Sequence, residues 1–168
     1  MRVLTLLALT ATLPLAAQQA AMSIGYGVGH RVDDTARGLV DSDGFDALDG
    51  GRVISLGFSA PERAFVGYPW FDIDWAHDEE GDNRFDTVTV FYVERVDIWR
   101  MWVGGGVGTV YNNVKVGASR DEEWGFGAKA VVGITIGGPL AVEAAYTYAD
   151  TTNGQKMDYY SLVALLRF

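Results

Sequence analysis

The stretch that decides the fold reads WGFGAKAVVGIT and spans residues 124–135. Every second residue from Trp124 to Ile134 is apolar, and most of those between them are Gly, Lys or Thr. A period of two residues is typical of a β-strand, because successive side chains of a strand point to opposite faces. The stretch therefore predicts a strand with one strongly apolar face.

The same alternation appears eight times along the chain. The alternating runs are 22–29, 53–60, 70–75, 87–92, 101–111, 124–135, 140–148 and 159–168. In the run 87–92 either face could be the apolar one, because Thr and Phe alternate there with Val and Tyr. Most runs are long enough for a tilted strand that crosses a bilayer, which needs roughly 9–11 residues. After residue 17 no segment reaches 18 consecutive apolar residues, so no membrane-spanning helix is predicted.

The connections between the runs alternate in length. Long polar connections are expected at 31–50, 77–86, 112–123 and 150–158, and short ones near 61–63, 97–98 and 137–139. Strict alternation places all long loops at one end of an up-and-down barrel, as in transmembrane barrels. The four long connections hold 16 of the 22 acidic residues but only 6 of the 13 basic ones, so the net charge of −9 is concentrated at that end.

The size of the apolar face predicts which way it points. An eight-stranded barrel has an interior just wide enough for side chains, and the large apolar face would overfill it. Gly, Ser, Thr and a few charges fit inside better, so the apolar face is expected to contact lipid. The fold predicted is all-β, an eight-stranded antiparallel transmembrane up-and-down β-barrel. A soluble lipocalin-like binder, with its apolar face inward, is the alternative.

Charged residues on the inward face are candidates for an interior network of ion pairs, because an unpaired buried charge is costly. The six candidates are Asp72, Asp74, Arg100, Lys129, Glu143 and Arg167. Glu143 and Arg167, on neighbouring strands, are expected to pair. A proton or ion path through the barrel is the alternative interpretation. Aromatic residues expected to form interfacial girdles are Tyr26, Trp75, Trp99, Tyr111, Trp124, Tyr148, Tyr160 and Phe168.

The first 17 residues have the pattern of a secretory signal. A positive start is followed by an uncharged run rich in Leu and Ala, too short to span a bilayer as a helix. We expect residues 1–17 to be a cleaved signal peptide and 18–168 to be the barrel domain. A membrane anchor or a buried helix is the alternative.

The end of the chain resembles the last strand of bacterial outer-membrane barrels. Ser161, Leu166 and Phe168 occupy the polar and hydrophobic positions of that signature, which the barrel-assembly machinery reads, and Val163 stands where a Gly is usual. The segments 124–129 and 141–148 are similar to late strands of small OmpA-like and OmpX-like barrels. The resemblance implies an outer-membrane protein in contact with lipids and lipopolysaccharide. Its role would be structural or surface-interacting, in membrane integrity, adhesion or minor porin-like activity.

Composition and motifs exclude or disfavour several other classes. The absence of Cys rules out disulfides and Cys-based metal sites, and the absence of a basic stripe disfavours nucleic acid. Outer-membrane lipid A deacylases use a His-Ser pair on a late strand, but residues 145–150 contain neither. No catalysis and no cofactor are therefore predicted. An acyl hydrolase that resembles these deacylases is the alternative function. The acidic triplets 78–80 and 121–123 are expected to be solvated loop charge. The alternatives are contact with external ligands or with divalent cations.

Overall fold

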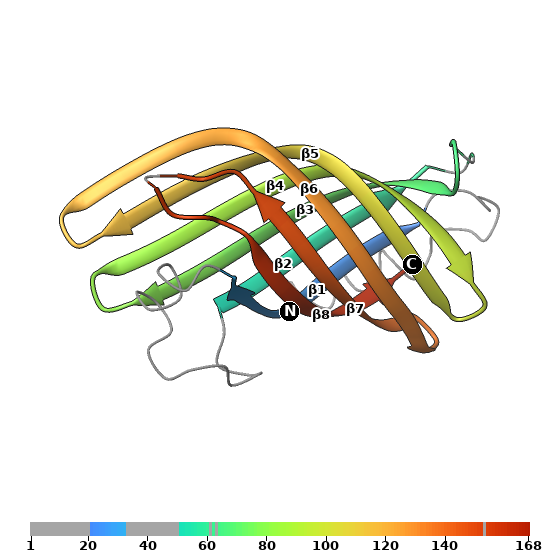
Figure 1. The fold of residues 1–168 in the computed structure, drawn as a ribbon. Coiled ribbons are helices and arrows are strands. Elements are labelled where there is room, and N and C mark those ends of the chain that lie inside the picture. The colour runs from blue at the N-terminus through green and yellow to red at the C-terminus, as the bar shows by residue number, and fades with distance from the viewer. Residues whose placement is uncertain (1–20, 33–50, 61, 63, 153) are drawn as a thin grey trace, which may run out of the picture.

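The computed structural model describes residues 21–32, 51–60, 62, 64–152 and 154–168. These residues form one closed barrel, in which each strand pairs antiparallel with the next and β1 pairs with β8 (Figure 1). The strands are β1 (Met22–Arg31), β2 (Gly51–Ser59), β3 (Tyr68–Glu80), β4 (Asn83–Ile98), β5 (Met101–Val116), β6 (Ser119–Gly137), β7 (Leu140–Ala149) and β8 (Tyr159–Arg167). The predicted eight-stranded up-and-down barrel is confirmed.

The two ends of the barrel sheet meet along β1 and β8. Met22 and Phe168 exchange backbone hydrogen bonds of 2.8 and 3.0 Å, and the pairing continues from Ser23 opposite Arg167 to Arg31 opposite Tyr159. Closure along this seam leaves no unpaired edge between β1 and β8, and a membrane would not tolerate one. In the described residues no helix is both long enough and apolar enough to cross a membrane.

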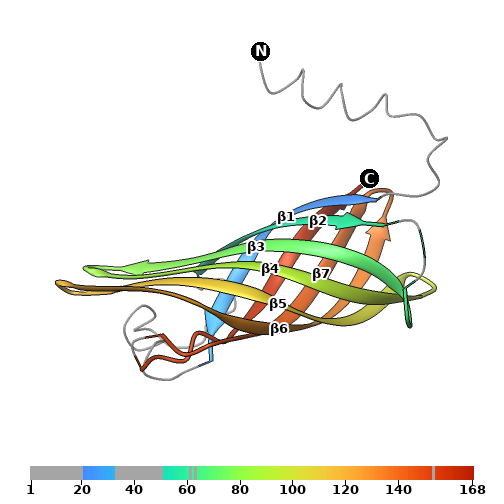
Figure 2. The same cartoon turned by 90° about the horizontal axis from the view of Figure 1, so that it is seen from above.

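Two hairpins extend beyond the rest of the barrel. The segments 77–86 and 112–123 were expected to be loops, but β3 and β4 stay paired up to Glu80 and Asn83, and β5 and β6 up to Val116 and Ser119 (Figure 2). Each hairpin closes with a two-residue turn whose first residue is a glycine of positive φ, Gly81 (58°) or Gly117 (57°), as short hairpins favour. The loop prediction was wrong there because polar and charged residues predominate on both faces, so no apolar periodicity marks these strand ends.

The other connections also depart from expectation. The connection between β2 and β3 spans residues 60–67 rather than the short turn expected at 61–63. Most of the first long connection, residues 33–50, and the expected signal peptide lie outside the described residues.

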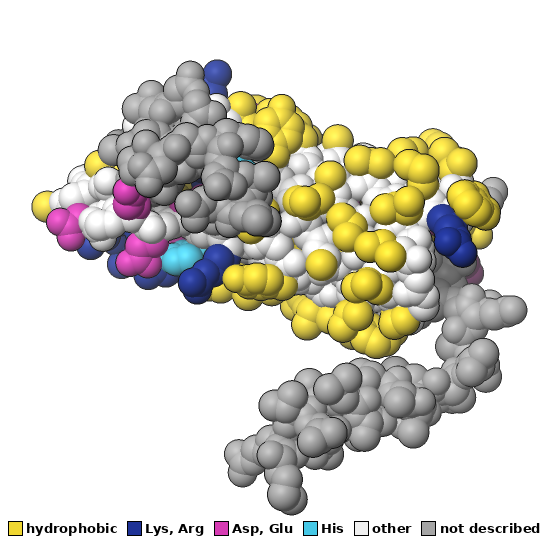
Figure 3. Space-filling model, turned by 90° about the horizontal axis from the view of Figure 1, so that it is seen from below, with side chains coloured by type: hydrophobic (Ala, Val, Ile, Leu, Met, Phe, Trp, Pro, Cys, Tyr) yellow, Lys and Arg dark blue, Asp and Glu magenta, His cyan; other side chains and the backbone are white. Residues whose placement is uncertain are grey.

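The wall of the barrel is apolar on its outside. Ile24, Ile73, Val90, Val107 and Leu162 all project outward and are exposed, and Figure 3 shows hydrophobic side chains spread over the barrel wall. Only lipid makes such a surface tolerable, so the wall is that of a membrane-spanning barrel. The soluble alternative required this face to point inward, and the structure places it outward.

The interior contains more than small and charged residues. Trp70, Trp102, Phe91 and Tyr159 point into the barrel and are almost completely buried. Glycines make room for them: a Cβ on Gly133 would collide with the indole of Trp102. The aromatic rings and the charged groups therefore fill the lumen together.

Candidate functional site

A network of charged side chains lies inside the barrel and is centred on Lys129 of β6. Its Nζ lies 2.7 Å from Asp74 Oδ2, 3.0 Å from Asp72 Oδ2 and 3.8 Å from Glu143 Oε1. Asp72 is 1% exposed and Lys129 5% exposed, so both groups have lost their contact with water. Loss of either partner would leave an uncompensated buried charge, which is strongly destabilising.

Arg95 of β4 is the second cation of this network. Its guanidinium lies 2.8 Å from Asp72 Oδ2 and 3.1 Å from Glu143 Oε2, and the ring of Trp70 covers it at 4.5 Å. The indole Nε1 of Trp102 donates a further hydrogen bond of 2.9 Å to Glu143. Sequence reasoning missed Arg95 because the apolar face of β4 was undecided. Arg95 lies two residues after Val93 and four residues after Phe91, and both of these point inward. This alternation would have placed Arg95 in the lumen.

The structure brings together four of the six predicted interior residues, namely Asp72, Asp74, Lys129 and Glu143. The expected Glu143–Arg167 pair is not formed among the described ion pairs. Glu143 lies opposite Val163, four residues before Arg167, which is about 13 Å along the strand. The guanidinium of Arg167 instead stacks over Trp102 at 4.4 Å and over Trp70 at 5.1 Å.

Arg100 does not point into the barrel, and this prediction was wrong. It is exposed in the two-residue turn between β4 and β5, where its guanidinium lies 5.4 Å from the ring of Trp99. Trp99 has a φ of 57°, so the chain reverses direction before the inward alternation of β5 begins at Trp102.

A second polar cluster lies in the lumen nearer the hairpins. Arg31 forms an ion pair of 2.8 Å with Asp78 and donates hydrogen bonds of 3.0 Å to Thr87 and to the carbonyl of Met157. Asn112 donates to Thr152 and to the carbonyl of Asp150. These contacts tie the connection between β7 and β8 across the mouth of the barrel.

The predicted girdle residues point outward from the wall. Five outward residues on adjacent strands form one paired row, which we call the aromatic row. It consists of Ile54, Trp75, Val88, Tyr111 and Trp124. The exposed Tyr148 and Tyr160 lie on β7 and β8, and Tyr26 lies in the middle of β1 rather than near its end. Trp99, at the opposite end, is 91% exposed.

The C-terminal residues occupy both faces of the last strand. Leu166 and Phe168 project outward, whereas Ser161 lies on the inward face with Val163 and Leu165. Recognition by an assembly machinery remains a proposal.

A cluster of side chains lies outside the barrel, just beyond the aromatic row. Asp86 lies 2.8 Å from His77 Nδ1 and 2.6 Å from Arg84 Nε, and it accepts a hydrogen bond of 3.3 Å from the indole of Trp75. Burial raises the pKa of Asp86, but the hydrogen bonds from Arg84 and His77 outweigh burial and hold the pKa below its ordinary value. The carboxylate is therefore the anchor of this cluster.

The acidic triplets do not converge on one point. Alternation places Asp78 toward the barrel axis, where it meets Arg31, and places Glu79 on the outer face. Among the described residues no group of three or more His, Asp or Glu side chains has an arrangement that would hold a metal ion.

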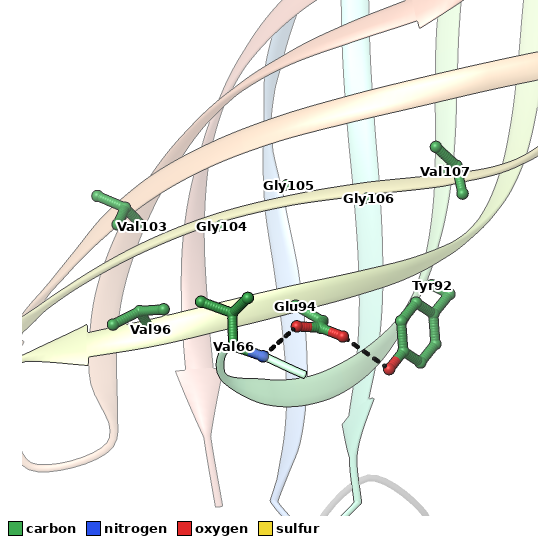
Figure 4. A pocket seen from close by; sticks show the side chains of 9 residues that line it. All are labelled: Val66, Tyr92, Glu94, Val96, Val103, Gly104, Gly105, Gly106 and Val107. Atoms are coloured by element: carbon green, nitrogen blue, oxygen red, sulfur yellow. Dashed lines mark hydrogen bonds between the residues drawn. The ribbon is translucent and has the colours of Figure 1, made fainter. Parts of the chain in front are cut away.

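A groove of about 630 Å³ lies on the outer wall between β4 and β5 (Figure 4). Val96, Val103 and Val107 form apolar sides, and Gly105 contributes no side chain to the floor. Glu94 enters the groove and accepts hydrogen bonds from the backbone amides of Val66 (2.9 Å) and Phe65 (3.3 Å) and from the hydroxyl of Tyr92 (3.2 Å). Because three donors engage it, this carboxylate holds the connection between β2 and β3 against β4.

The barrel has counterparts among solved structures. No protein-family model and no curated protein sequence matches the chain. The crystal structure of Ail, the attachment invasion locus protein of Yersinia pestis, is similar to it with a TM-score of 0.61 and 17% identity, covering 89% of this chain and 98% of Ail.

Two further solved structures have the same fold. Ail in complex with the heparin analogue sucrose octasulfate gives a TM-score of 0.56 at 17% identity, with the same coverage. Neisserial surface protein A gives 0.51 at 12% identity, covering 89% of this chain and 96% of that protein. The chain therefore shares the closed eight-stranded barrel fold of these proteins, as its resemblance to small outer-membrane barrels implied.

Proposed function

We propose that the chain is an outer-membrane barrel that acts through surface contacts made by its two extended hairpins. Residues 1–17 direct export, the mature barrel begins near residue 18, and the barrel-assembly machinery reads Ser161, Leu166 and Phe168. The fold shared with Ail and Neisserial surface protein A supports this placement.

The observation that carries the proposal is the contrast between a filled lumen and the extended hairpins. The network around Lys129, the rings of Trp70 and Trp102, and the Arg31 cluster occupy the interior, so the barrel offers no wide path for solutes. The hairpins project paired backbone beyond the aromatic row, where their side chains are available to an external partner. The proposal contains no catalytic step and no cofactor.

The charge of the hairpins favours one kind of external partner. On their axis-facing sides all charged residues are acidic: Asp78 is paired with Arg31, and Glu80, Asp121 and Glu123 lie on the same side. A partner with a basic surface suits this acidic side better than a sulfated glycan such as the heparin analogue bound to Ail.

The test is a fractionation and binding experiment in a Gram-negative host. We expect the protein in the outer-membrane fraction, with heat-modifiable migration on gels, and no conductance steps in planar bilayers. Cells that display the full chain should bind an extracellular-matrix surface. A variant in which residues 79–84 and 115–120 are each replaced by Asn-Gly turns should remain heat-modifiable and lose that binding. Unchanged binding, or recovery in the soluble periplasm, would contradict the proposal.

A further inference from the structure

Cations gather on one face of the extended hairpins. Beyond the aromatic row, register pairs the outward residues into two more rows. The first contains Arg52, His77, Asp86, Asn113 and Glu122, and the second, which we call the cation row, contains Glu79, Arg84, Lys115 and Arg120. Three neighbouring strands therefore contribute three adjacent cations to the side of the sheet that carries the lipid-facing wall.

The two faces of the hairpins differ in charge. All basic residues of the segments 77–86 and 112–123 lie in the cation row, together with Glu79, whereas every charged residue on the axis-facing side of these segments is acidic. The hairpins are acidic overall, but their cations are confined to the outward face. Acidic residues occupy both faces, and on the outward face Asp86 and Glu122 pair with Arg84 and Arg120.

The cation row has a built pocket. Arg84, Asn113, Lys115 and Arg120 line a cavity of about 150 Å³. Arg84 is held by Asp86 at 2.6 Å, and Arg120 is held by Glu122 at 2.6 Å and by the amide oxygen of Asn113 at 3.1 Å. Within the part of the chain that the structure describes, the exposed Lys115 has no ion-pair partner. Two guanidinium groups are thus fixed around one free ammonium.

The height of the pocket matches that of lipid headgroups. Each member of the cation row on β4, β5 and β6 lies four residues beyond the aromatic row on its own strand. A rise of about 3.3 Å per residue at a tilt of about 40° places it about 10 Å farther from the membrane centre. Aromatic girdles lie at the interface, which is roughly 5–7 Å thick on each side, so the backbone of the cation row lies just beyond the headgroup layer and its long Arg and Lys side chains can reach the headgroups.

We propose that this pocket binds a phosphate group on the headgroup of a glycolipid in the outer leaflet. Arginine and lysine are the side chains that bind phosphate best, and basic residues at a membrane surface are attracted to anionic lipid. The volume is below that of pockets for whole small molecules, which suits a single phosphate whose lipid chains remain against the wall. The inference rests on the membrane placement proposed above.

The test measures binding of diphosphorylated lipid A to the full protein folded in detergent micelles, by native mass spectrometry. The variant K115Q/R120Q removes two cations of the pocket. The matched control R100Q/K156Q removes two exposed cations elsewhere. We expect at least a tenfold weaker affinity for K115Q/R120Q and unchanged affinity for the control, with both variants heat-modifiable.

Equal affinities in the two variants would overturn the proposal. So would equal competition by millimolar inorganic phosphate, which would assign the pocket to free phosphate, or tighter binding of a heparin fragment, which would assign it to a sulfated glycan. Failure of the proposed function would appear instead as loss of outer-membrane fractionation, which this titration does not measure.

Discussion

Lys129 and Lys115 are the same side chain on neighbouring strands of one barrel, and their surroundings have opposite consequences. Lys129 faces the lumen, where three carboxylates lie within 4 Å of its Nζ. Lys115 faces outward on a hairpin and is exposed to solvent. The comparison teaches that strand alternation decides whether a charge serves the stability of the barrel or remains available for binding.

The largest expected difference between the two lysines is in stability, and it is measured by removing each ammonium group in turn. Lys129→Met leaves three buried carboxylates with Arg95 as the remaining cation of the network, and we expect it to lower the free energy of unfolding by about 3–5 kcal/mol. Lys115→Met should change it by less than about 1 kcal/mol, because exposed charges contribute little. Urea unfolding in lipid bilayers measures both. Equal effects of the two substitutions would contradict the assignment of different roles.

A second comparison sets a glycine inside the lumen against one at its rim. A Cβ on Gly133 would collide with Trp102, whereas a Cβ on Gly137 has no atom within 4 Å. Gly133→Ala should therefore cost about 1–3 kcal/mol through overpacking. Gly137→Ala should cost nothing, and it is the matched control in the same urea experiment. A neutral Gly133→Ala would show that the lumen is less tightly filled than the contacts indicate.

The smallest effect concerns Asp86 in the outer cluster. Its pKa is lowered, so the stabilising contacts with Arg84 and His77 are fully present above the ordinary value of 3.8 and are lost as the pH falls through the lower value in the folded protein. The indole N–H resonance of Trp75, which donates to Asp86, should shift only below about pH 4 and should not titrate there in Asp86→Asn. A midpoint above pH 4 would contradict this.

Much of the fold could be predicted from alternation. The run around Trp124 identified β6 and its outward face, and Asp72, Asp74, Lys129 and Glu143 were assigned to the interior by parity alone. Alternation predicts the orientation of side chains in these strands because lipid on one side requires apolar residues, whereas the packed lumen on the other side holds the small and charged ones. It failed in the hairpins, where both faces carry polar and charged residues.

Most of the contacts that the sequence did not predict depend on the register of the strands and on the width of the lumen. Glu143 pairs with Arg95, three strands away, because the lumen is narrow enough for side chains to meet across it. The cation row was likewise hidden, because Arg84 is far in sequence from Lys115 and Arg120 and meets them only in the register.

The most direct test of an outward apolar face is a spin-label scan along β4, the strand whose face the sequence left undecided. The chain contains no Cys, so single substitutions at residues 88, 89, 90 and 91 each give one labelling site. In bilayers, labels at Val88 and Val90 should be accessible to oxygen dissolved in lipid, and labels at Thr89 and Phe91 should not. A reversed phase, or the absence of alternation, would contradict the account.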